Sequence, residues 1–133
     1  MSEKEQEKIL RAVSRGLKLK KTFSFSAAFV GSPVIKRLNR IYRGKNETTD
    51  VLSFPFKDKT TVGEILICSA RAKKQAREFR HSFETEATIL LVHGLIHLFG
   101  YDHLKEKEAK KMFTLQKRIL KTLGIEWSVP EVG

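Results

Sequence analysis

The sequence predicts an α/β (α+β) fold in which a single small mixed sheet is packed with helices. Its 133 residues have the usual length of one domain, so residues 1–133 are expected to form a single domain. Hydrophobic residues make up 41% of the chain, which is enough to fill one core. Stretches with helical spacing alternate with short strand-like stretches, in the order helix, strand, helix, two strands and then helices.

Two helices and a strand are expected before residue 44. Residues 3–15 place apolar side chains on one helical face. Residues 22–30, TFSFSAAFV, alternate apolar and small polar side chains, which indicates a strand. Residues 32–43 begin with a serine that can cap a helix and with Pro33 at the first helical position. Apolar residues then follow at helical spacing: Val34, Leu38 and Ile41.

Two further strands are expected at residues 51–56 and 62–69. Pro55 confines the first of them to a sheet edge or a strand end, because proline has no N–H to donate. The second is apolar and β-branched, and it is expected to pair with the first. Cys68 is the only cysteine, so it cannot form an internal disulfide and is interpreted as a small core residue.

The rest of the chain is expected to be mainly helical. Residues 70–80 have a strongly helical composition. Residues 82–99 are predicted to form the central buried helix, with Ser82 among the capping groups at its start. Residues 105–124 form an amphipathic helix that Gly124 ends.

The charge of the chain favours a polyanionic partner. Lysine and arginine number 26 against 15 acidic residues, which gives a net charge of +11. Such an excess attracts nucleic acid, although the lysines could also serve only to keep the surface hydrated. No run of residues is long and apolar enough for a membrane span, and the charged N-terminus lacks the apolar region of a secretory signal. We therefore expect a cytoplasmic protein without membrane association.

Three of the four histidines lie in HGLIHLFGYDH, residues 93–103. On a helix, His93 and His97 lie on one face and can direct two imidazoles at one point. Gly100 can end the helix in a left-handed conformation, after which His103 can turn back towards the same point. The spacing therefore predicts one metal ion at the end of the central helix. Imidazole ligands suit Zn²⁺ best, with Ni²⁺, Co²⁺ or Cu²⁺ as alternatives.

Three protein ligands leave a coordination position for water, which is typical of a catalytic zinc. The spacing matches the metzincin protease pattern, but Gly94 stands where such proteases have the glutamate base, which argues against peptide hydrolysis. A glycine inside a helix costs about 1 kcal/mol relative to alanine, so something is expected to pack closely there, such as sheet backbone. Asp102 can accept an N–H from a ligating imidazole or cap the next helix, and both roles stay open. His81 is interpreted as a loop or surface residue, with a place near the site as the alternative.

A second constellation lies in NRIYRGKNETTDVLSFPF, residues 39–56. Arg43 ends a helix, and Gly44 and Lys45 begin a loop. An arginine there can present its fork to a phosphate, although a solvated arginine favoured by the helix dipole would look the same in sequence.

Together these stretches resemble the YbeY family, bacterial metal-dependent endoribonucleases of ribosomal RNA maturation and ribosome quality control. The shared patterns are N-x-x-Y-R-G-K and T-D-V-L-S-F-P-F in residues 39–56, G-[DE]-I-x-I in residues 63–67, and H-G-x-x-H-L-x-G-Y-D-H in residues 93–103. Thr48 departs from a usual proline, and Glu64 from a commoner aspartate. The resemblance implies a mixed sheet packed with helices, single-stranded RNA as substrate and the ribosome as partner. It also implies a zinc site at His93, His97 and His103 and a functionally important Arg43.

The resulting hypothesis is hydrolysis of an RNA phosphodiester by metal-activated water. His93 acts as a metal ligand and catalytic residue, and Arg43 binds the phosphate and stabilises charge in the transition state. Arg37, Arg40 and Lys45 would extend the RNA-binding surface, unless they are only a solvated basic face. The general base stays open between the metal hydroxide, Glu64, Asp102 and an RNA 2′-hydroxyl.

Two alternatives to this hypothesis remain. One is a zinc hydrolase of peptides or small esters, which Gly94 disfavours. The other is a non-catalytic ribosome-associated factor in which the metal only stabilises the fold.

Overall fold

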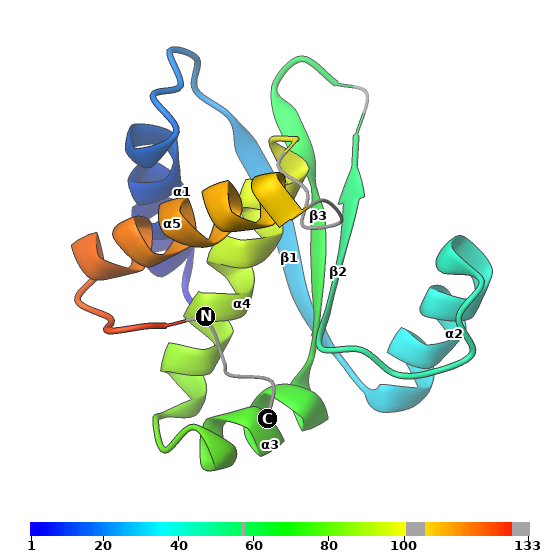
Figure 1. Cartoon of the computed structure of the whole chain (residues 1–133). Helices are drawn as coiled ribbons and strands as arrows, with labels where there is room; N and C mark the ends of the chain where they lie inside the picture. The colour runs from blue at the N-terminus through cyan, green and yellow to red at the C-terminus, as the bar shows by residue number, and fades with distance from the viewer. Residues whose placement is uncertain (57, 101–105, 129–133) are drawn as a thin grey trace.

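A computed structural model describes residues 1–56, 58–100 and 106–128. Within these residues the chain forms five helices and three strands in the predicted order (Figure 1). Their bounds are α1 Glu3–Gly16, β1 Ser24–Val30, α2 Ser32–Arg43, β2 Val51–Pro55, β3 Thr61–Cys68, α3 Ser69–Glu78, α4 Phe83–Leu98 and α5 Glu106–Thr122. None of the described helices is both long enough and apolar enough to cross a membrane.

The three strands form one mixed sheet in the order β1-β3-β2. Strand β3 pairs with β1 in parallel and with β2 in antiparallel orientation, so the predicted pairing of the two later strands is confirmed. Pro55 ends β2, which lies at an edge of the sheet. The missing N–H of proline therefore interrupts no ladder in the sheet interior, as predicted.

Helices cover both faces of this sheet (Figure 1). On one face α4 packs against the strands and α1 and α5 pack around α4, with Ile65 and Ile67 of β3 in this core. On the other face α2 packs over Leu66 and Cys68, the residues that alternate with the two isoleucines along β3. The interpretation of Cys68 as a core residue is confirmed, because its side chain is fully buried.

Helix α2 faces the sheet through a different set of residues from the predicted one. Ile35 and Asn39 are buried, whereas Val34 and Ile41 are 43% and 58% exposed. Of the predicted apolar stripe, only Leu38 packs against the core, where it is partly buried. The prediction of this helix face was wrong because Asn39, a polar residue, occupies a position that faces the core. The buried positions of the helix therefore cannot be identified from its apolar residues alone.

The start of α2 also differs from the prediction. Gly31 is the N-cap residue, and Ser32 is the first helical residue, without a side-chain capping bond. The Ser32 hydroxyl instead lies 3.6 Å from the sulfur of Cys68, at the end of β3. The Ser32 hydroxyl therefore contacts the sheet and does not cap the helix.

Candidate functional site

Helix α4 carries His93 and His97 on a well-defined helix. At its start the Ser82 hydroxyl accepts a hydrogen bond from the Thr85 N–H at 3.1 Å, as predicted. Most of the helix is buried against the sheet, α1 and α5, so packing fixes the direction of its side chains. At its end Gly100 has a φ of +100°, and its N–H donates to the His97 carbonyl at 3.0 Å. The glycine takes the conformation predicted for it, immediately after the histidine pair.

His93 and His97 lie one turn apart on the same face of α4, about 6 Å apart along the helix axis. His93 is half-buried and lines a cleft of about 850 Å³, whereas His97 is exposed. Nδ1 of His93 lies 2.8 Å from Oε1 of Gln116, a buried residue of α5. Sequence reasoning missed this glutamine, although a polar residue among the apolar positions of a predicted helix was a usable signal.

The third predicted ligand, His103, and its neighbour Asp102 lie outside the described residues. Within residues 1–56, 58–100 and 106–128, no three His, Cys, Asp or Glu side chains are grouped so as to hold a metal ion. The two imidazoles of α4 fit the donor set that divalent transition metals prefer. The set of three ligands stays a prediction.

Gly94 lies between the two histidines, on the side of α4 that faces the sheet. A Cβ atom at this position would lie 3.0 Å from Ser53 Oγ and 3.1 Å from Cγ2 of Ile65. The Ser53 hydroxyl also donates to the Gly94 carbonyl at 3.4 Å. The predicted close approach is confirmed, but side chains of β2 and β3 make it and not sheet backbone. The residue at 94 is therefore small because the sheet occupies the space.

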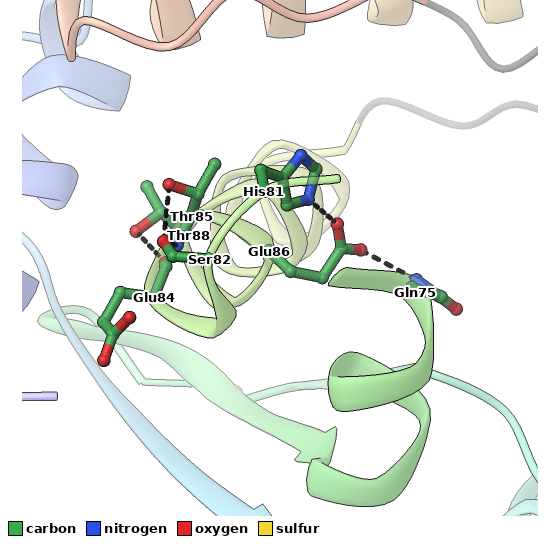
Figure 2. A network of polar contacts seen from close by, with 7 residues as sticks. All are labelled: Gln75, His81, Ser82, Glu84, Thr85, Glu86 and Thr88. Carbon is green, nitrogen blue, oxygen red and sulfur yellow. Dashed lines mark hydrogen bonds and ion pairs between the residues drawn. The ribbon is translucent and has the colours of Figure 1, made fainter. Parts of the chain in front are cut away.

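His81 has a partner that sequence reasoning missed. It lies between α3 and α4, and Figure 2 shows its ring beside the carboxylate of Glu86. Nε2 of His81 is 2.6 Å from Oε1 of Glu86, and Gln75 donates to the other carboxylate oxygen at 2.8 Å. Glu86 is only 2% exposed, and these two contacts satisfy a carboxylate that would be costly to bury alone.

The polar network of Gln75, His81 and Glu86 lines the same cleft as His93. His81 is a loop residue between α3 and α4, as predicted, and it also lies near the site, which the sequence offered as the alternative. The signal was the spacing of seven residues between Glu86 and His93, which places both on one face of α4. Packing of α3 beside the start of α4 then brings His81 and Gln75 to that carboxylate.

The basic loop after α2 is held by a buried amide. Arg43 ends the helix, and Gly44 follows in the left-handed conformation with a φ of +70°. Asn39 is buried in α2, and its Nδ2 donates to the Glu47 carbonyl at 2.9 Å, which ties the loop back to the helix. The four predicted RNA-binding side chains are all exposed: Arg37, Arg40, Arg43 and Lys45.

The sheet separates helix α2 from the histidines, whereas Asp50, at the end of the loop that follows α2, lines the cleft of His93. Helix α2 lies on the face of the sheet opposite to α4 (Figure 1). Strand alternation also directs Glu64 to the α2 face, because its neighbour Ile65 packs against Gly94 of α4. Glu64 therefore lies on the face of the sheet opposite to α4, and its role as a possible base stays a prediction. Arg43 and Glu64 share one face, and His93 belongs to the other.

Comparisons with known proteins agree with this fold. The family model described as Endoribonuclease YbeY matches residues 1–124. A protein of Ureaplasma urealyticum named Endoribonuclease YbeY is 43% identical over 127 residues, which cover 92% of this chain and 82% of the relative. A protein of Lysinibacillus sphaericus with the same name is 39% identical, with 90% and 84% covered. The solution structure of a Thermotoga maritima protein is 35% identical and superimposes with a TM-score of 0.62 over 90% of this chain and 79% of that one.

Proposed function

The chain belongs to the YbeY family of endoribonucleases, and we propose that His93, His97 and His103 hold the metal ion of its active site. As a member of this family it is an endoribonuclease, a hydrolase of RNA phosphodiester bonds, that acts in ribosomal RNA processing and depends on a metal. The observation that carries the residue assignment is the pair of imidazoles one turn apart on one face of α4, beside a cleft.

We propose Zn²⁺ as the native metal, in a single site. Imidazole nitrogens are preferred ligands of zinc, and Ni²⁺, Co²⁺ or Cu²⁺ suit the same donors. Held there by three imidazoles, such an ion would lower the pKa of a bound water molecule towards neutrality and so would supply a hydroxide nucleophile. His93 and His97 contribute fixed positions, because α4 is clamped between the sheet and two helices. Asp102 stays our candidate for a group that orients a ligand or accepts a proton.

We propose that the RNA backbone lies along the basic face of α2 and reaches the histidines around the edge strand β2. The described residues that line the cleft beside His93 include no lysine or arginine for the phosphates. The exposed arginines of α2 can supply positive charge to the phosphates. Near the end of this helix, the Tyr42 ring packs against Phe54 of β2 at a centroid distance of 5.2 Å. Arg43 is the next residue along α2, so its backbone lies near this edge of the sheet.

Single-stranded RNA is the proposed form of the substrate, with the ribosome as the place of action and the cytoplasm as the compartment. The net charge of +11 supports a polyanionic partner. A single strand can bend around a sheet edge, whereas a double helix is a stiff rod with a fixed groove geometry.

Arg43→Ala is expected to lower the rate of RNA cleavage by about 10²-fold, because one fixed donor to the transition-state charge is lost. Arg43→Lys should recover only part of the rate, since an ammonium lacks the planar fork that grips two phosphate oxygens. The measurement is cleavage of a single-stranded oligonucleotide at saturating substrate.

The matched control is Arg11→Ala, which removes the same charge from an exposed position on α1. This variant should cleave RNA at the wild-type rate. Equal losses in both variants would show that Arg43 acts only through the net charge, which contradicts its proposed role at the phosphate.

Elemental analysis of the purified protein tests the metal assignment directly. We expect about one equivalent of zinc per chain, loss of cleavage on chelation and recovery on adding Zn²⁺, as for a catalytic zinc. The chelated protein should keep its circular dichroism spectrum, because the core is packed by apolar side chains and includes neither His93 nor His97. Unfolding on chelation would instead favour a structural metal. Turnover of peptides without RNA cleavage would favour the peptide hydrolase.

A further inference from the structure

Gln116 occupies a position in α5 where an apolar residue would be expected. Met112 lies four residues before it and Leu120 four residues after it, and both are fully buried in the main core. Gln116 lies on the same face and is 2% exposed. A buried amide is costly unless it forms hydrogen bonds, so this side chain needs a partner in the core.

The partner of Gln116 is the ring of His93. The amide Oε1 lies 2.8 Å from Nδ1 of His93. An amide oxygen can only accept a hydrogen bond, so Nδ1 of the neutral imidazole must carry the proton and donate it. Nε2 of the same ring then keeps its lone pair. Both His93 and Gln116 line the cleft, and their contact joins α4 to α5.

We infer that Gln116 is a positioning residue that holds His93 in the Nδ1–H tautomer and thereby presents Nε2 to the metal ion. This inference rests on the proposed function, since it gives the tautomer a purpose at the metal. A ligating imidazole binds through the nitrogen that has no proton, and the hydrogen bond at its other nitrogen determines which one that is. Gln116 also fixes the plane of the ring, because its own side chain is immobilised by burial.

The contact gives α5 a role at the active site. His103, the third proposed ligand, lies in the sequence between α4 and α5. Gln116 of α5 contacts α4 by its hydrogen bond with His93, the first proposed ligand. A change in α5 at this position would therefore act on the metal through His93, without contact with the ion or the RNA.

Three variants separate this role from simple packing. Gln116→Met keeps a side chain of similar length but removes the acceptor. Gln116→Glu restores an acceptor at the same place. Gln75→Met is the matched control, because Gln75 lines the same cleft but donates to Glu86 and not to His93.

The first measurement is the imidazole ¹⁵N NMR spectrum of the metal-free protein, which reports the tautomer of each ring. The wild type, Gln116→Glu and Gln75→Met should all show His93 protonated at Nδ1. Gln116→Met should move the proton to Nε2, because Nδ1–H would otherwise be left without an acceptor. His97 should keep its spectrum in all four proteins.

The second measurement is metal affinity by competition with a chromophoric chelator. Gln116→Met should weaken zinc binding by about 10- to 100-fold, the usual effect of losing such a partner of a ligating histidine. Gln116→Glu should bind zinc at least as tightly as the wild type, since a carboxylate is the stronger acceptor. RNA cleavage at limiting zinc should follow the same order and recover in Gln116→Met when zinc is in excess.

The inference is overturned if Gln116→Met keeps both the Nδ1–H tautomer and the wild-type zinc affinity, or if His93 in the wild type is protonated at Nε2. The proposed function fails in a different way. A wild-type protein that binds no metal and cuts no RNA would refute the metal site, while the tautomer measurement, which needs neither, would still report on Gln116.

Discussion

His97→Ala is expected to lower the rate of RNA cleavage by about 10³-fold. The metal ion contributes several kcal/mol to stabilising the transition state, and each 1.36 kcal/mol corresponds to about a tenfold change in rate. Only two proposed ligands would remain to hold it. His97 is exposed in the last turn of α4, so its removal should leave the fold and its thermal stability nearly unchanged. The loss of rate should therefore be accompanied by loss of zinc, measured by elemental analysis.

The matched control for this variant is His81→Gln. His81 is a cleft histidine whose ring contacts Glu86, and a glutamine can still donate to that carboxylate. This variant should keep its zinc and its cleavage rate. Cleavage by His97→Ala at the wild-type rate, in preparations free of contaminating nuclease, would contradict the proposed metal site. Zinc retained in full by His97→Ala would also contradict it.

Gly94→Glu is expected to destabilise the protein by at least about 3 kcal/mol, from overpacking together with burial of a carboxylate. A Cβ at this position already lies 3.0 Å from Ser53 Oγ, so the rest of a glutamate side chain has no room between α4 and the sheet. The melting temperature, followed by circular dichroism, should fall by about 10 °C or more. The substitution completes the protease pattern in sequence, yet peptide hydrolysis is not expected.

Gly94→Ala is the control for the glutamate variant. Alanine gains about 1 kcal/mol in helix propensity, while Ser53 and Ile65 must each move by a few tenths of an ångström. The two effects should largely cancel, and the melting temperature should stay near that of the wild type. A Gly94→Glu protein as stable as Gly94→Ala would show that the helix does not approach the sheet as closely as described.

The sequence was sufficient for features that depend on neighbouring residues. The helical period places His93 and His97 on one face, and Gly100 alone supplies the left-handed residue that ends α4. Ser82 caps the start of that helix because its partner is only three residues away. The predicted strand pairing holds for a similar reason, since β2 and β3 follow each other closely in the sequence.

Sequence reasoning failed where a polar residue belongs to a buried face. Asn39 occupies the sheet-facing side of α2, which shifted the predicted apolar stripe onto exposed positions. Gln116 likewise occupies the core-facing side of α5, and its partner is 23 residues away. Such residues can be interpreted only when the partner is known, and the partner comes from the packing of another element.

The sequence by itself determined the family, the order of the elements and the pair of imidazoles on α4, because local spacing and short motifs specify all three. Only the tertiary structure decided that Gln116 meets His93, that His81 joins Glu86 at the same cleft, and that Arg43 and Glu64 lie across the sheet from the histidines. The physical reason is that these relations depend on which face each strand and helix turns to its neighbours. Burial of the whole core determines which face of each element points inward, and the residue spacing within a single segment does not show this.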